Sequence, residues 1–157
     1  KSKGKPNETG VLADARAARD WLARREGVAP ERLIIMGESI GGAVAVDLAA
    51  EKGARGLILE STFTSLRDVA AYHFPWLPVR LLMHTQLDSL SKIKKYQGPL
   101  LQSHGDRDTI VPYRFGQRLF EAANQPKQFI TFRGGDHNDL RGKDYYARLG
   151  EFVAGLK

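Results

Sequence analysis

The sequence contains no cysteine among its 157 residues, which excludes disulfide bonds, thiolate metal ligands and a cysteine nucleophile. It has no apolar run near the ~18 to 20 residues that a membrane-spanning helix needs, and it does not open with the segments of a signal peptide. Hydrophobic residues make up 42% of the chain and charged residues 27%. This composition is typical of a globular domain and excludes a wholly disordered chain.

The chain also lacks a concentrated region of one charge. Its net charge is +6, from 24 Lys and Arg against 18 Asp and Glu, but the densest basic run, Lys92 to Lys95, is short. No basic stripe alternates with aromatic residues in the way that single-strand nucleic-acid binding requires. We therefore predict no nucleic-acid partner and interpret the basic residues as solvated surface, with a functional basic patch as the alternative.

Helical and strand patterns alternate along most of the chain, with Thr9 as the predicted N-cap of the first helix and Gly27 at its end. The strand segments are short and almost wholly apolar, which is typical of strands buried on both faces of a parallel sheet. The fold class is therefore predicted to be α/β, with a mostly parallel sheet flanked by helices. Helices are predicted at residues 9–25, 43–52, 113–124 and 144–156, and strands at 33–36, 56–60, 100–103 and 128–132.

One stretch between the second and third strands breaks this alternation. It runs from Ser61 to Tyr96, is rich in large apolar and aromatic residues, and carries Pro75 and Pro78. We refer to it as the 61–96 segment. It is interpreted either as an ordinary crossover packed on the sheet or as a small lid-like insertion over an apolar pocket.

The first chemical motif lies between the predicted strand at 33–36 and the following helix. Gly37-Glu38-Ser39-Ile40-Gly41 matches the nucleophile-elbow pattern Gly-x-Ser-x-Gly, which needs a tight strand-to-helix turn that exposes the serine Oγ. Ser39 is the predicted nucleophile, and the backbone N–H of Ile40 is a predicted oxyanion donor. The alternative is a glycine-rich turn that serves packing alone.

A serine nucleophile needs a base, and the order along the chain for this arrangement is serine, acid, histidine. His137 follows the last predicted strand in a glycine-rich loop and is the predicted base. The other histidines fit this order less well: His104 directly follows a strand, where it is expected to bond loop backbone, and His73 and His84 lie in the 61–96 segment.

The acid has three candidates, because Asp106 and Asp108 follow the third strand and Glu60 ends the second. Asp108 is favoured, since the acid must be held rigidly enough to fix the imidazole tautomer. Asp106 is expected to shape its own turn as an Asx side chain. Asp136 adjoins His137 and is poorly placed to reach its ring.

These motifs resemble those of serine α/β-hydrolases, and the resemblance runs through nearly all of the chain. It is closest to the small-lid, α/β-hydrolase-domain-containing group with prolyl-oligopeptidase-like similarity. The resemblance implies Ser39 as nucleophile, Asp108 as acid and His137 as base, with no metal and no cofactor. The shared stretches are GESIGG, HGDRDTIVP, GGDHND, Glu60–Ser65 and Asp88–Leu90.

The chain departs from this family at its N-terminus. The family builds an eight-stranded sheet, whereas this sequence supplies only about the last four strands, so residues 1–157 are expected to form a single partial α/β-hydrolase domain. The resemblance implies that the absent half carries the second oxyanion donor. The expected partners are therefore the missing N-terminal half and a small-molecule or acylated substrate. A cytoplasmic and a membrane-associated location both stay open, because a membrane anchor upstream of Lys1 would not be seen.

Two functions follow from these observations. The first is a serine hydrolase that cleaves a carboxylic ester, thioester or amide through an acyl-enzyme on Ser39. The second is a non-catalytic or truncated scaffold that acts as an interaction module, since a fold by itself does not fix a function. Without the upstream strands the chain alone is expected to be weakly active or inactive, and the strand at 33–36 is expected to form an apolar sheet edge.

Overall fold

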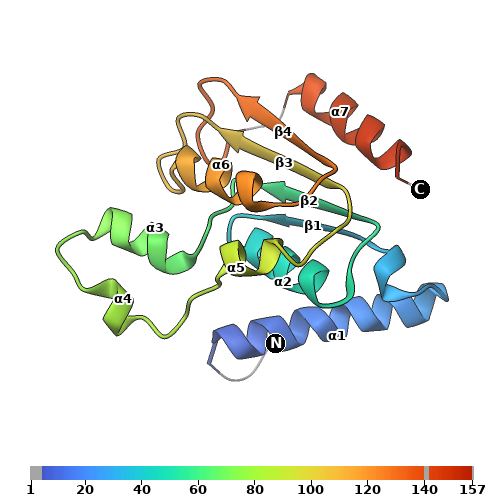
Figure 1. The fold of residues 1–157 in the computed structure, drawn as a ribbon, viewed down its shortest axis with the longest axis horizontal. Helices are drawn as coiled ribbons and strands as arrows, with labels where there is room; N and C mark the ends of the chain where they lie inside the picture. Colours follow the sequence, from blue (N-terminus) through green and yellow to red (C-terminus); the bar gives the residue numbers. More distant parts are fainter. Residues whose placement is uncertain (1–4, 140–141, 157) are drawn as a thin grey trace.

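The computed structural model describes residues 5–139 and 142–156, and shows a parallel sheet with helices on both faces (Figure 1). The four strands are hydrogen-bonded in the order β1-β2-β3-β4, and every pairing is parallel. The predicted fold class is therefore confirmed. The elements in chain order are α1 Glu8–Glu26, η1 Pro30–Arg32, β1 Ile34–Glu38, α2 Ile40–Lys52, β2 Gly56–Glu60, α3 Leu66–His73, α4 Val79–Leu82, α5 Ser89–Ile93, β3 Leu100–Gly105, α6 Tyr113–Ala122, β4 Lys127–Phe132 and α7 Lys143–Ala154.

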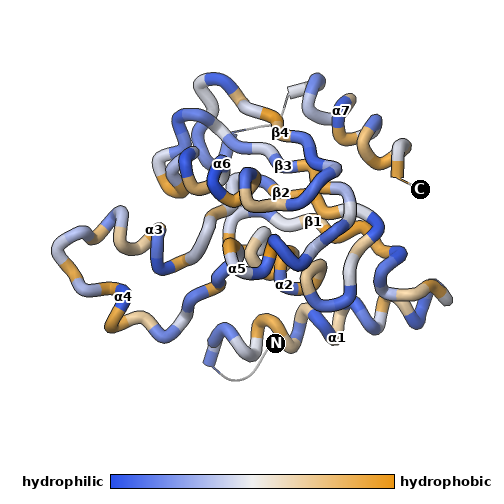
Figure 2. The backbone as a smooth tube through the Cα atoms, in the orientation of Figure 1, coloured by the Kyte–Doolittle hydropathy of each residue, from blue (hydrophilic) through white to orange (hydrophobic). Residues whose placement is uncertain are grey.

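Two hydrophobic cores lie on opposite faces of the sheet, because successive side chains of a strand point to opposite faces. Leu57 and Leu100 belong to the core that the sheet forms with α2, α5 and α6. Ile58 and Leu101 belong to the second core, which they form with Phe152 and other residues of α7 and its end. Figure 2 shows hydrophobic residues concentrated along the central strands and α2.

The first strand differs from its neighbours, since it lies at the edge of the sheet. Ile35 is buried, but Ile34 and Met36 point to the other face and are 37% and 53% exposed. The expectation that this strand is buried on both faces is wrong, whereas the expected apolar edge is present. The reason is that α7 covers the second face over β2 and not over β1: Phe152 of α7 and Leu156, which follows the helix, pack at Gly56 of β2.

The first two helices do not begin where the sequence predicts. The first helix is capped by Asn7, whose Oδ1 accepts from Gly10 N at 2.8 Å, so Thr9 is not the N-cap. Gly27 ends this helix as predicted, with a left-handed φ of 65°. The second helix begins at Ile40 instead of Ala43, because the glycines of the motif form its first turn.

Within the described residues, no helix has the length and apolarity to span a membrane.

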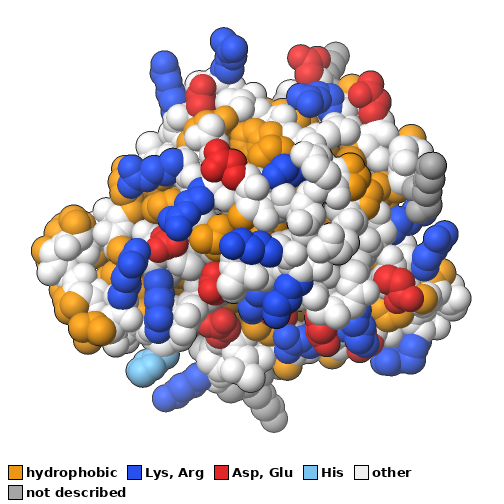
Figure 3. All heavy atoms as spheres, in the orientation of Figure 1, with side chains coloured by type: hydrophobic (Ala, Val, Ile, Leu, Met, Phe, Trp, Pro, Cys, Tyr) orange, Lys and Arg blue, Asp and Glu red, His pale blue; other side chains and the backbone are white. Residues whose placement is uncertain are grey.

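The 61–96 segment has two parts with different packing. Its base is buried: Phe63 and Leu87 belong to a third core beside the start of α2, and Ile93 of α5 is fully buried against the sheet core. Its tip, around α3 and α4, projects from the body of the molecule (Figure 1). Trp76 and Leu81 are 72% and 84% exposed there, and Figure 3 shows hydrophobic side chains gathered on this projection. The base is thus a packed crossover, whereas the tip lacks cover from the described residues.

Candidate active site

Ser39 lies in the turn between β1 and α2 and has a backbone φ of 52° and ψ of −121°. A non-glycine residue in this region is strained and persists only where its surroundings hold it. The turn is tight enough that a Cβ atom at Gly37 would collide with the carbonyl of Gly41. At Gly42 a Cβ atom would lie 2.5 Å from Thr62 Oγ1. Glycine is therefore required at both positions for the strand and helix to approach so closely.

The strained turn is held by hydrogen bonds from the next strand. Ser39 N donates to Glu60 O at 2.9 Å, which continues the pairing of β1 with β2. Ser39 O accepts from Thr62 Oγ1 at 2.8 Å and from Gly42 N at 3.0 Å. These bonds fix the backbone of Ser39 from both sides.

Three predicted residues lie in one hydrogen-bonded chain at the carboxyl edge of the sheet. His137 Nε2 is 3.1 Å from Ser39 Oγ, and His137 Nδ1 is 2.7 Å from Asp108 Oδ2. Asp108 follows β3 and His137 follows β4, and the carboxyl ends of parallel strands meet at one edge. Because a carboxylate only accepts, Nδ1 carries the proton and the lone pair of Nε2 faces the serine hydroxyl.

Asp108 is held on both of its oxygens. Its Oδ1 accepts from Ile110 N at 2.9 Å and from Val111 N at 2.7 Å, while its Oδ2 faces His137. Burial alone raises the pKa of Asp108, but hydrogen bonds from His104, His137 and Val111 outweigh it, and the net pKa lies below its usual value. The carboxyl group is therefore ionised and rigidly oriented.

The other predicted acids do not reach the His137 ring. Asp106 Oδ1 accepts from Gly134 N at 2.6 Å. It thereby joins the loop after β3, residues 106–112 (the acid loop), to the loop after β4, residues 133–139 (the histidine loop). The expectation that Asp106 bonds its own turn is wrong, because its carboxylate accepts from the histidine loop instead. Glu60 is buried and accepts from the hydroxyl of Tyr145.

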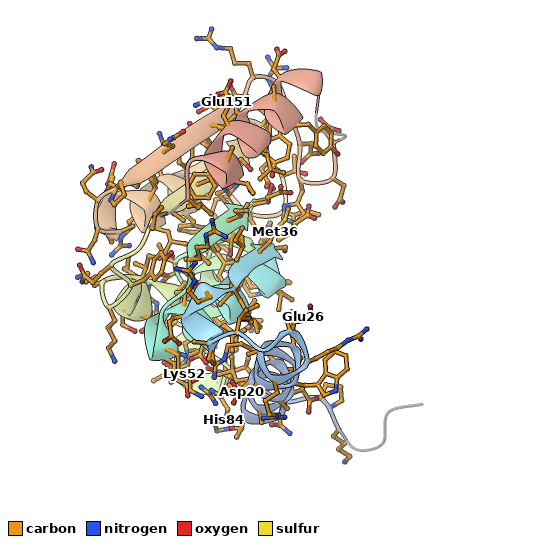
Figure 4. The ribbon with its side chains drawn as sticks, turned by 90° about the vertical axis from the view of Figure 1, so that its right-hand side faces the viewer. Asp20, Glu26, Met36, Lys52, His84 and Glu151 are labelled. Carbon is orange, nitrogen blue, oxygen red and sulfur yellow. The ribbon has the colours of Figure 1, made fainter. Side chains whose placement is uncertain are left out.

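The remaining histidines also lie outside this chain of bonds. His104 Nε2 is 2.9 Å from Val111 O, as expected for a histidine that bonds loop backbone. His73 Nε2 is 2.8 Å from Ile110 O, and His84 is exposed beside α1 (Figure 4).

The sequence analysis assigned no supporting role to two residues near the site. Thr62 holds the serine turn by donating to Ser39 O. The feature of the sequence that could have indicated this role is the Ser61-Thr62 pair, which directly follows a buried strand. Asp136 Oδ1 accepts from Thr109 N at 2.8 Å and from His137 N at 2.7 Å, so it ties the histidine loop to the acid loop. These bonds, led by the one from Thr109, lower the pKa of Asp136.

The surroundings of Ser39 are open. Ser39 is half-buried, and the Ile40 side chain beside it is 52% exposed. A cavity of about 540 Å³ lies behind the histidine loop between β4 and α7, but Ser39 and His137 do not line it. In the described part of the chain, no group of three or more histidine and carboxylate side chains is arranged to hold a metal ion.

The parallel sheet, the serine at the turn after β1 and the histidine after β4 are the features of the α/β-hydrolase fold, and they place this chain in that fold class. A family model described as "Alpha/beta hydrolase domain" matches residues 1–145. An uncharacterized protein of Mycobacterium tuberculosis is 44% identical over 136 residues, covering 87% of this chain and 48% of that protein. Human alpha/beta hydrolase domain-containing protein 17B is 38% identical over 157 residues, covering 98% of this chain and 52% of that protein. An acetyl xylan esterase from a Paenibacillus species has the same fold, with a TM-score of 0.77 at 18% identity over 94% of this chain and 52% of its own.

The chain therefore belongs to the alpha/beta hydrolase family. It spans about half the length of the curated relatives it matches. Its placement in the small-lid, prolyl-oligopeptidase-like group stays a prediction.

Proposed function

We propose that this chain carries the nucleophile, base and acid of a serine hydrolase that cleaves a carboxylic ester, thioester or amide. The observation that carries the proposal is the hydrogen-bonded chain from Ser39 Oγ through His137 to Asp108. Its three members come from separate loops that the parallel sheet brings to one edge. A turn that served packing alone would not need a histidine and a buried carboxylate aligned with its serine.

The reaction proceeds in two halves. His137 Nε2 takes the proton of Ser39 as Oγ attacks the substrate carbonyl, and Asp108 stabilises the imidazolium that forms. Collapse of the tetrahedral intermediate breaks the bond to the leaving group, which takes its proton from His137, and leaves an ester on Ser39. Water, deprotonated by His137, then attacks this ester; the acid is released and the Ser39 hydroxyl regains its proton.

The oxyanion of the intermediate needs donors beside Ser39. Ile40 is the first residue of α2, and its backbone N–H is the proposed donor, since helix N-termini present free N–H groups. A second donor is proposed to come from the upstream half of the domain. That half is the proposed partner of this chain, and the open edge at β1 is the observation that favours it.

The substrate is proposed to carry an apolar acyl group. The support is the exposed apolar tip of the 61–96 segment, which is proposed to act as a lid-like insertion. His73 at the end of α3 contacts Ile110 beside Asp108, so the tip lies next to the acid loop. The name of the Paenibacillus relative in fold, an esterase, favours an ester over an amide.

The test is covalent labelling with a fluorophosphonate probe, read by intact mass on this chain and on a longer chain with the upstream strands. Labelling of the native protein and its loss in Ser39→Ala, by at least 10³-fold, is the expected result. Ser91→Ala is the matched control, because Ser91 is an exposed serine on α5. Absence of labelling in the longer chain, or labelling that survives Ser39→Ala, would favour the interaction-module function instead.

A further inference from the structure

Asp108 is in contact with two histidines, of which the proposed mechanism uses only one. The second is His104 of β3, which is fully buried. Its Nε2 lies 2.9 Å from Val111 O and 3.2 Å from Asp108 Oδ2, the oxygen that also faces His137. The single Nε2 of this buried imidazole therefore lies within donor distance of two oxygens, Val111 O and Asp108 Oδ2.

The surroundings of His104 fix where its proton lies. Both groups that face Nε2 are acceptors, a carbonyl and a carboxylate, so Nε2 carries the proton. Its Nδ1 has no hydrogen-bond partner within residues 5–139 and 142–156. A Cβ atom at Gly116 would collide with Nδ1, so the ring has no room to shift toward α6. The ring of Tyr113, the first residue of α6, packs edge-on against the His104 ring, with centroids 5.7 Å apart.

His104, Val111 and Asp108 form a closed ring of contacts. His104 Nε2 bonds Val111 O, Val111 N donates to Asp108 Oδ1 at 2.7 Å, and Asp108 Oδ2 lies next to His104 again. One imidazole N–H therefore restrains the acid loop in two ways, through the backbone and through the carboxylate itself.

We propose that His104 is a positioning residue: its Nε2–H holds Asp108 so that Oδ2 stays aligned with His137 Nδ1. This inference rests on the proposed function, because it assigns His104 to the same proton-transfer chain. Without His104, the carboxylate loses a donor and gains freedom to rotate, and the His137 ring loses its fixed orientation toward Ser39.

The electrostatics of the loop support this role. After burial, which raises the pKa of Asp108, the hydrogen bond from His104 is the largest influence that lowers it. The titratable groups that face Asp108 directly are His104 and His137, while Asp136 acts on it through its charge.

The kinetic test compares His104→Leu with His104→Gln. Fluorophosphonate labelling and ester hydrolysis are measured in the longer chain with the upstream strands. The leucine variant is expected to lose about tenfold in labelling rate and in kcat, with KM within about twofold, because one hydrogen bond to a charged group is removed. The glutamine variant keeps an N–H donor and is expected to recover to within about threefold of the native rate. His84→Gln is the matched control, since His84 is exposed and lies beside α1 (Figure 4).

A second measurement does not need activity. The ring nitrogen chemical shifts of ¹⁵N-labelled histidines report the tautomer of each imidazole. We expect His104 with its proton on Nε2 and His137 with its proton on Nδ1, and in His104→Leu a shift of His137 toward the other tautomer. His84 resonances should stay unchanged.

The outcomes separate the two proposals. His104 with its proton on Nδ1 would overturn the positioning role, as would native labelling and native His137 shifts in His104→Leu. A native protein that the probe does not label, but whose His137 tautomer depends on His104, would remove the proposed function and leave the positioning role in place. If His104→Leu does not fold, the native tautomers and the glutamine variant still decide the question.

Discussion

Two edges of the same sheet differ in how far their residues are buried and hydrogen-bonded. At the carboxyl edge of β3 and β4, Asp108 and His137 are buried, hydrogen bonds cross-link the acid loop and the histidine loop, and both oxygens of Asp108 are bonded. At the lateral edge, β1 leaves Ile34 and Met36 exposed, and Figure 4 shows Met36 on this open edge. The comparison teaches that Ser39, His137 and Asp108 are brought together by this chain, whereas β1, the strand before Ser39, pairs on one side only among the described residues.

The physical cause is that the polar groups at the two edges find their hydrogen-bond partners in different ways. At the carboxyl edge, the two loops satisfy each other's carboxylates: Asp106 accepts from the histidine loop, and Asp136 accepts from the acid loop. The lateral edge of β1 presents backbone groups that only another strand satisfies fully. The predictions below test this difference, from the largest expected effect to the smallest.

The largest effect is expected at the assembled edge. Asp108→Asn keeps the shape of the side chain but removes the charge that fixes the His137 tautomer, so the labelling rate of Ser39 should fall by about 10³ to 10⁴-fold. Asp106→Asn, which alters only the bond to Gly134 N, should stay within about tenfold of native. Equal losses in the two variants would contradict the role given to Asp108.

The next effect concerns the open edge. If the proposed second oxyanion donor lies in the upstream half, a longer chain with those strands should be labelled about 10² to 10³-fold faster than this chain, since losing one such donor typically costs that much. The measurement is the second-order rate of labelling of both proteins under one set of conditions. Comparable rates would show that the present chain already holds every group that the reaction requires.

A third effect tests the packing behind Ser39. Gly42→Ala places a Cβ atom 2.5 Å from Thr62 Oγ1, and overpacking of this kind should lower the free energy of unfolding by about 1 to 3 kcal/mol. Gly41→Ala is the matched control, because a Cβ atom there meets nothing within 4 Å. Chemical denaturation of the two variants measures the difference. A destabilisation of equal size at both positions would show that helix propensity, not the contact with Thr62, decides the result.

The smallest effect is a dependence of stability on pH. The folded-state pKa of Asp108 is lowered, so its contribution to stability is present above the unfolded pKa, near ~3.9, and is lost as the pH falls through the folded value. The difference in free energy of unfolding between the native protein and Asp108→Asn should therefore shrink as the pH is lowered from 7 to below 4. A difference that stays constant over this range would contradict the lowered pKa.

Much of the fold was predictable because its signals are local. The strand segments are apolar runs bounded by Gly or Pro, and Gly27 ends the first helix as the sequence indicates. The predictions failed where burial or capping depends on how other residues pack in space. The apolarity of Ile34 and Met36 suggested burial on both faces, but burial depends on whether another element covers the strand. Thr9 has the chemistry of an N-cap, but Asn7 is the residue whose side chain reaches an unpaired N–H.

The candidate site was predictable to a similar extent. Ser39, Asp108 and His137 follow from motif and chain order, and the structure brings them within hydrogen-bonding distance. The bonds that hold them were not predictable, because Thr62 and Asp136 join segments that are remote in sequence. The contact of His104 with Asp108 spans only four residues, but it depends on how the turn between them folds. No spacing rule indicates which carboxylate accepts from which loop.

The sequence by itself determined the elements and the types of reacting groups in this protein, since apolar periodicity and glycine placement act over a few residues. Only the tertiary structure decided which histidine faces which oxygen of Asp108, and which apolar strand is left uncovered. Both depend on how the loops and helices pack around the sheet, and hydrogen bonds and burial require a partner in space that the order of residues does not specify.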